Sequence, residues 1–305
     1  VAAGLGEVLL SPAVAALPSE TPEKDMSTLH SLYGYGLVGV VLVSTLFLHF
    51  AGNRYWMYLT FFWAVLPVIA SVLLFAAKLP DMNMEQSEVE EIRSGYRTKG
   101  IALCMACIFL GACAENTMSN WISVYTENVL RMPKMWGDIF GMCLFAAFLA
   151  LTRSAYAKFG KNIFRVLMMG MLGAIACYAF VAFSSNAVLS LIGCVLVGIC
   201  TSMLWPGTLI LMEEKIPAAS VSAYALMAAG GDLGASFAPQ TMGIVVDRIS
   251  VTRWAQELGG SLSLSPEQVG FKAGMLVAAV FPLLGVLLLL YMRKFFKISG
   301  GNPEK

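Results

Sequence analysis

Long apolar runs recur along the whole chain and constrain its fold more than any other feature. Runs of about 17–25 residues can cross the hydrocarbon core of a bilayer as helices. Of the 305 residues, 58% are hydrophobic and 13% are charged, whereas a soluble domain has about 25% charged residues. Because so little charge cannot cover a surface that faces water, the sequence predicts a polytopic membrane protein.

Charged residues, prolines and glycines divide the apolar runs into nine predicted spans. Within lipid, backbone N–H and C=O groups must be paired inside each segment, so the spans are expected to be helices and the fold to be all-α. The predicted spans cover residues 1–17, 26–50, 55–78, 99–126, 136–157, 163–183, 186–212, 218–246 and 269–292.

The distribution of Lys and Arg predicts the orientation, because cytoplasmic loops are enriched in both. With a cytoplasmic C-terminus, 14 of the 20 Lys and Arg residues lie inside and 6 outside. We therefore expect a multi-pass protein of the cell (inner) membrane with its C-terminus in the cytoplasm. The net charge of +1 gives no indication of a nucleic-acid partner.

The longest polar connection, residues 79–98, is expected to be a cytoplasmic central loop. It separates three spans in residues 1–78 from six in residues 99–292, and residues 293–305 are expected to form a cytoplasmic tail. On the opposite side, the charged residues between 247 and 257 are expected to lie in a long solvated loop.

Cys104 and Cys107 form a C-x-x-C pair, a spacing typical of metal or redox sites in soluble proteins. Both lie inside an apolar span, with no second Cys pair or His cluster nearby in the sequence. We interpret them as small packing residues, and we expect neither a metal nor another cofactor.

An internal repeat occurs at a constant offset of 194 residues. Each copy is a helix, a short charged loop and a second helix. The offset covers six predicted helices, an even number, so both copies run the same way through the membrane. Seven identities place Gly4, Leu10, Pro12, Leu17, Glu20, Leu32 and Gly36 on Gly198, Leu204, Pro206, Leu211, Glu214, Leu226 and Gly230.

Two parallel halves of six helices resemble the plan of the major facilitator superfamily. The resemblance implies that residues 99–292 form the C-terminal six-helix bundle and that residues 1–78 are the second half of the N-terminal bundle. On this plan the chain is N-terminally truncated: about nine of twelve transmembrane helices are present, and the first three would precede Val1.

The segment from Arg153 to Lys161 is similar to a loop of that superfamily, G-x-x-x-D-R-x-G-R-R. Here it is expected to follow the predicted span 136–157. It departs from the pattern, because Arg153 replaces the first glycine and Ala157 replaces the aspartate. The resemblance therefore does not carry the charge pair linked to this motif over to this half.

Glu7 is the one carboxylate in the stretch GLGEVLLSPAVAALP. A charged residue near the bilayer centre costs roughly 2.5–3.5 kcal/mol, and such residues usually face an internal cavity. Removal from water favours the neutral acid, which makes proton exchange possible. No Lys or Arg lies in the same span. We predict that Glu7 couples transport to a proton; the alternative is a protonated side chain that only packs.

Within the superfamily, GLGEVLLSP resembles the fourth helix of the fucose permease branch, which has a Glu five residues before a Pro. The stretch MSTLHSLYGYG is similar to the fifth helix of that branch, whose polar side chains face the sugar. The resemblance implies that Glu7 exchanges a proton and that His30 and Tyr33 help to hold the solute. Because that branch typically has Gln and Asn where His30 and Tyr33 stand, the solute need not be a sugar.

Glu115 and Asp232 also lie inside predicted spans and are further candidates for proton coupling. Glu115 adjoins a polar stripe of Asn116, Asn120 and Ser123 at i, i+4 and i+7, which should face protein or water. Asp232 lies among glycines whose main role is expected to be helix packing. The candidate solute-binding residues are His30, Tyr33, Asn116, Asn120, Trp121 and Trp205.

Together these features predict a monomeric secondary active transporter that moves a small polar solute, such as a sugar, by alternating access, with a proton as the coupling ion. The sequence has no P-loop, so ATP is not expected to supply the energy within this chain. An exporter of amphiphilic compounds and a transport-inactive sensor on the same fold stay open. A membrane enzyme is disfavoured, because His30 and His49 are the only histidines.

Overall fold

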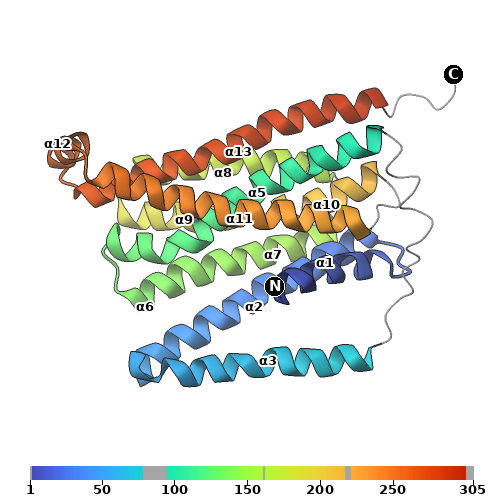
Figure 1. Ribbon diagram of the computed structural model, residues 1–305. Coiled ribbons are helices and arrows are strands. Elements are labelled where there is room, and N and C mark those ends of the chain that lie inside the picture. Colours follow the sequence, from blue (N-terminus) through green and yellow to red (C-terminus); the bar gives the residue numbers. More distant parts are fainter. Residues whose placement is uncertain (1, 78–94, 161, 217–220, 300–305) are drawn as a thin grey trace.

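The computed structural model describes residues 2–77, 95–160, 162–216 and 221–299, and within these ranges every regular element is a helix (Figure 1). The prediction of an all-α membrane fold is confirmed. Residues 79–94 of the predicted central loop lie outside the described ranges.

A helix is present at each predicted span. The bounds are α1 (Ala2–Ala15), α2 (Pro22–Ala51), α3 (Trp56–Ala76), α5 (Gly95–Asn128), α6 (Lys134–Gly137) continuing through η2 (Asp138–Cys143) into α7 (Leu144–Phe159), α8 (Ile163–Phe183), α9 (Ala187–Thr201), α10 (Leu204–Lys215), α11 (Val221–Ser250) and α13 (Pro266–Ser299).

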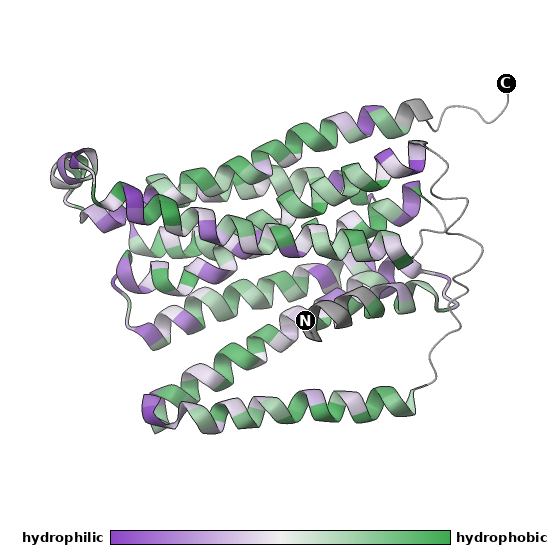
Figure 2. Cartoon of the chain, in the orientation of Figure 1, coloured by the Kyte–Doolittle hydropathy of each residue, from purple (hydrophilic) through white to green (hydrophobic). Residues whose placement is uncertain are grey.

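In the described part of the chain, seven helices or continuous helical segments are long and apolar enough to cross a membrane. The other two predicted spans are α1, which has 14 residues, and α11, which has 30 residues and includes several polar side chains and glycines. Figure 2 shows hydrophobic residues over most of the length of the helices, with hydrophilic residues concentrated toward their ends.

Three predicted connections are more helical than expected. Residues 95–98, placed in the central loop, form the first turn of α5. Residues 293–299, placed in the tail, continue α13. The segment similar to the superfamily loop is helical up to Phe159, because α7 extends beyond the predicted span.

The prediction of a long loop between residues 247 and 257 is wrong as well. Asp247 and Arg248 belong to the last turns of α11, whereas Arg253 and Glu257 lie in a separate helix, α12 (Arg253–Leu262). Thr252 starts α12, because its Oγ1 accepts a hydrogen bond from the N–H of Ala255 at 3.1 Å.

The helices form an elongated bundle with α12 and α6 at one end, here called the α12 end, and the C-terminal end of α13 at the other (Figure 1). Helix α5 packs against α9, α10, α11 and α13, and α2 packs along α7. By contrast, α3 lies at the edge of the bundle, and among its residues, all of them described, only Leu59 is buried.

The repeat is reflected in how the helices meet. The offset relates α1 to α9–α10 and α2 to α11. In the structure α1 packs on α11 and α10 packs on α2. The first helix of each copy therefore contacts the second helix of the other copy. This is the relation expected of two similar halves that face each other.

Candidate functional site

A cavity of about 560 Å³ lies where α1 and α2 meet α5, α7, α10 and α11. Its volume falls within the range of about 300–1,000 Å³ that is usual for small-molecule sites. The residues that line it are Leu10, Ser11, Leu29, His30, Leu32, Tyr33, Glu115, Asn116, Arg153, Trp205, Asp232 and Ala235.

An ion pair between Glu115 on α5 and Arg153 on α7 forms one wall of this cavity. Nη2 of Arg153 donates to both carboxylate oxygens of Glu115, at 3.1 Å to Oε1 and 3.0 Å to Oε2. Only 6% of Glu115 and 2% of Arg153 are exposed. A carboxylate and a guanidinium removed from water to this extent are stable only as partners.

The other nitrogens of Arg153 bind backbone oxygens on different helices. Nε donates to the carbonyl of Ser202 at 2.7 Å, and Nη1 donates to the carbonyl of His30 at 2.9 Å. Ser202 follows the last residue of α9, where the helix turns before α10, so its carbonyl lacks the usual partner within a helix. In return, the hydroxyl of Ser27 donates to the carbonyl of Arg153 at 2.8 Å. Arg153 thus joins α2, α5, α7 and the α9–α10 turn.

This role of Arg153 is not among the predictions from the sequence, in which Arg153 is one of the cytoplasmic charges and begins a loop. The signal was present, since Arg153 lies inside the predicted span 136–157. An arginine inside an apolar helix needs an acid from elsewhere in the bundle, and Glu115 was already a candidate.

Asp232 lines the same cavity from α11, and its side chain is exposed. The glycines on either side hold α11 against α5: a Cβ atom at Gly230 would lie 2.6 Å from Cγ of Met105, and one at Gly234 would collide with the carbonyl of Phe109. A Cβ atom at Gly231 would collide with the indole ring of Trp205. The glycines therefore serve close packing, as predicted.

His30, Tyr33 and Asn116 complete the polar lining of the cavity. The ring of Tyr33 has its centroid 6.0 Å from Cζ of Arg153. The amide of Asn116 donates to the carbonyl of Ala112 in its own helix at 3.1 Å. Nε2 of His30 is buried, and no hydrogen-bond partner for it is found among the described residues.

Two predicted solute-binding residues lie apart from the cavity. Asn120 is exposed and donates to the carbonyl of Asn116 at 2.8 Å. The indole N–H of Trp121 donates to the carbonyl of Pro239 at 3.0 Å, and its ring meets Phe271 edge to face. Trp121 thus contacts α11 and α13, and neither residue is among those that line the cavity.

The side chain of Glu7 lies outside the described part of the structure, although its backbone belongs to α1. Glu7 lies one helical turn before Ser11, which is 7% exposed and lines the cavity.

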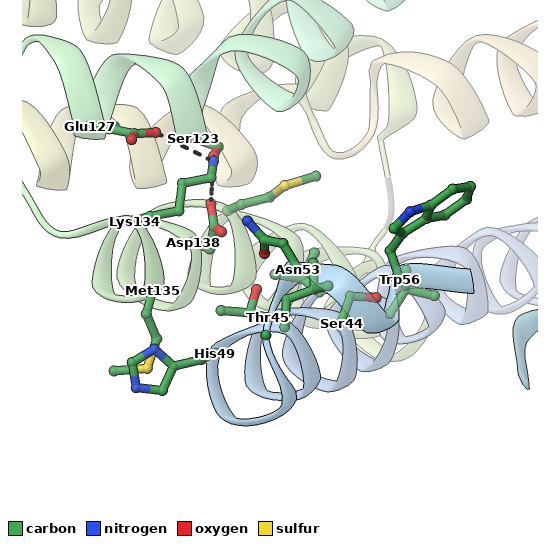
Figure 3. Close-up of a pocket in the computed structure, with 15 residues that line it drawn as sticks. Ser44, Thr45, His49, Asn53, Trp56, Ser123, Glu127, Lys134, Met135 and Asp138 are labelled. Atoms are coloured by element: carbon green, nitrogen blue, oxygen red, sulfur yellow. Dashed lines mark hydrogen bonds and ion pairs between the residues drawn. The ribbon is translucent and has the colours of Figure 1, made fainter. Parts of the chain in front are cut away.

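A second cavity, of about 1,100 Å³, opens at the α12 end between the last turns of α2, the start of α3 and the α5–α6 connection (Figure 3). Lys134 points toward three side chains there: the hydroxyl of Ser123, Oδ1 of Asp138 at 3.4 Å and Oε2 of Glu127 at 3.7 Å. Ser123, the last residue of the predicted polar stripe, faces this cavity and not the first. None of the predicted site residues lines it.

The C-x-x-C pair packs in the hydrophobic core. Cys104 and Cys107 are both fully buried in the hydrophobic core, and neither forms a disulfide. Among the described residues, no three His, Cys, Asp or Glu side chains are close enough together to hold a metal ion.

Comparison with known proteins gives one result that bears on this site. No curated protein and no solved structure matches the chain. The family model described as Major Facilitator Superfamily matches residues 1–239, which include every residue that lines the cavity. Helices that can span a membrane, the all-α fold and this match together establish that the chain belongs to the Major Facilitator Superfamily of membrane transporters.

Proposed function

We propose that this protein is a secondary active transporter that moves a small polar solute by alternating access, and that the Glu115–Arg153 pair couples this movement to a proton. The observation that carries the proposal is that the buried pair lines a cavity between two groups of helices, α1 and α2 on one side and α5, α7, α10 and α11 on the other.

Protonation of Glu115 would change the energy of this arrangement, because it removes the negative charge opposite Arg153. Loss of one partner of a buried ion pair costs about 3–5 kcal/mol, since the remaining charge is left uncompensated. Arg153 also binds the carbonyl of His30 on α2 at 2.9 Å. A movement that brings the guanidinium back to water would therefore also alter the contact between α2 and α7.

Such a link is sufficient for coupling. A proton that binds one arrangement of the helices more tightly than the other shifts the equilibrium between them. Release of the proton on the opposite side restores the pair. Glu7, one turn before the cavity-lining Ser11 on α1, is the second carboxyl group that we assign to the proton.

Transport by the intact protein in proteoliposomes tests the proposal. A pH gradient should drive accumulation of a solute from a radiolabelled panel of sugars, amino acids and quaternary amines. Glu115→Gln should abolish accumulation but should retain exchange of the same solute across the membrane. Retained exchange would show that the variant is folded. Glu127→Gln is a matched control, because Glu127 is on the same helix but lies at the second cavity with its side chain 47% exposed.

The outcomes separate the alternatives. Accumulation by Glu115→Gln against a gradient would remove this residue from the coupling mechanism. Accumulation driven by Na⁺ and not by pH would replace the proton. Outward, pH-driven movement of amphiphilic compounds alone would favour an exporter. Absence of flux for the whole panel in the unmutated protein would favour a transport-inactive sensor.

A further inference from the structure

The charges in the first cavity, which the Glu115–Arg153 pair lines, are not equally available to a solute. The described residues that line it include one cation, Arg153, and two carboxylates, Glu115 and Asp232. Glu115 and Arg153 neutralise each other through two hydrogen bonds of 3.0 and 3.1 Å. The charge of the pair is therefore balanced before any solute binds.

Arg153 is an unsuitable partner for an anionic solute. Nε, Nη1 and Nη2 each already donate to an oxygen of the protein, and only 2% of the residue is exposed. An anion would have to displace Glu115, and that would leave a carboxylate buried without its partner, which is strongly unfavourable.

Asp232 is in the opposite situation. Its side chain is exposed and lines the cavity, and no ion pair to it is found among the described residues. The surface that this cavity offers to a solute is therefore negative. A carboxylate inside a membrane protein is costly unless something compensates it, and a positively charged solute would do so.

An aromatic ring of the cavity wall contacts the residue that precedes Asp232. The indole of Trp205 packs directly over Gly231, the residue before Asp232, and Trp205 is partly exposed and lines the cavity. Tyr33 lines the same cavity from α2. The face of an indole ring attracts an organic cation, and quaternary ammonium groups are commonly held in this way. Ammonium ions with exposed N–H groups would in addition bind the carboxylate directly.

From these contacts we infer that the solute of this transporter is a small organic cation, such as an amine or a quaternary ammonium compound, with Asp232 as its counter-charge and Trp205 as its aromatic contact. This inference rests on the proposed function. It assigns Asp232 to the solute, and it leaves proton coupling to Glu115 and Glu7.

Binding by the purified protein, measured by thermal stabilisation and by calorimetry, tests the inference without any transport. The cationic probes are choline, tetraethylammonium and tetraphenylphosphonium. The neutral probes are glucose, fucose and 3,3-dimethylbutan-1-ol, which has the shape of choline but lacks its charge. At least one of the three cations should bind. If choline binds, 3,3-dimethylbutan-1-ol should bind at least about tenfold more weakly, because the alcohol lacks the positive charge that attracts the ring and the carboxylate.

Two substitutions locate the binding. Asp232→Asn should weaken cation binding about tenfold to a hundredfold, because a charged partner is lost, and Asp232→Glu should retain most of it. Asp247→Asn, an exposed aspartate on the same helix, should have no effect. Trp205→Leu should weaken binding about tenfold, because the aromatic face is lost while an apolar side chain is kept.

The inference is overturned if none of the three cations binds, or if Asp232→Asn binds them as well as the unmutated protein does. Its failure is distinct from failure of the proposed function. A pH-driven flux of glucose or fucose without cation binding would refute the cationic solute and support the transporter. Cation binding without any proton-coupled flux would support the cationic ligand and refute the proton-coupled transporter.

Discussion

Gly34 on α2 lies directly against Ala150 on α7. A Cβ atom added at Gly34 would be 2.8 Å from Cβ of Ala150 and 3.0 Å from its Cα. The missing side chain therefore lets the two helix backbones approach each other, as small residues do in membrane proteins. Two positions further along α2, a Cβ atom at Gly36 would have no neighbouring atom within 4 Å. The two glycines form a matched pair for a test of this contact.

We predict that Gly34→Ala destabilises the protein by about 1–3 kcal/mol, the usual cost of overpacking a tight contact. Gly36→Ala should be neutral or should stabilise by up to about 1 kcal/mol, since alanine favours a helix over glycine. Unfolding of both variants in the same detergent would measure the difference. Equal stability of the two variants would mean that the α2–α7 contact does not depend on Gly34.

The Glu115–Arg153 pair should show strong non-additivity. Glu115→Leu and Arg153→Met should each destabilise by about 3–5 kcal/mol, because each leaves a buried charge without its partner. The double variant removes both charges and keeps apolar bulk, so its stability should return close to that of the unmutated protein. Proton-driven accumulation should be lost in all three. Unfolding of the four proteins completes the cycle, and a double variant as unstable as the sum of the single ones would contradict a direct pairing.

The contacts of Lys134 at the α12 end should contribute far less to stability. The side chain of Lys134 is 55% exposed, and its distances to Asp138 and Glu127 are 3.4 and 3.7 Å. Exposed pairs of this kind contribute about 0–1 kcal/mol, because water and salt already compensate the charges. Lys134→Met should therefore change the unfolding free energy by less than about 1 kcal/mol and should leave solute affinity unchanged. A loss as large as that for Arg153→Met would show that the second cavity depends on this lysine.

Glu7→Gln should abolish uphill, pH-driven uptake by the intact protein and should leave solute exchange measurable. The amide keeps the size of the side chain but cannot bind and release a proton. Uptake against a gradient, compared with equilibrium exchange at matched pH, separates the two effects. If Glu7→Gln still concentrates the solute, this residue is not a coupling site.

Much of the fold follows from the chain's chemistry alone. A bilayer forces each apolar run to satisfy its own backbone hydrogen bonds, so a helix lies at every predicted span. Polar side chains inside these runs indicated Glu115, Asn116 and Asp232. The resemblance to the fucose permease branch added His30 and Tyr33, and all five line one cavity. Helix α12 was missed although Thr252 is a typical N-terminal capping residue, because charged residues in a connection were interpreted as a solvated loop.

Tertiary structure decided which of the polar residues meet. Glu115 and Arg153 are 38 positions apart in the chain, and their contact depends on the rotation of α5 and α7 about their axes and on the packing between them. The same rotation turns Trp121 toward Pro239 on α11, away from the cavity, while Trp205 lies over Gly231 at its wall. Hydropathy and spacing fix how long a helix is and where its polar residues lie along it. The direction in which each polar residue points is set by the neighbouring helices, because contacts between distant segments determine how a helix is turned.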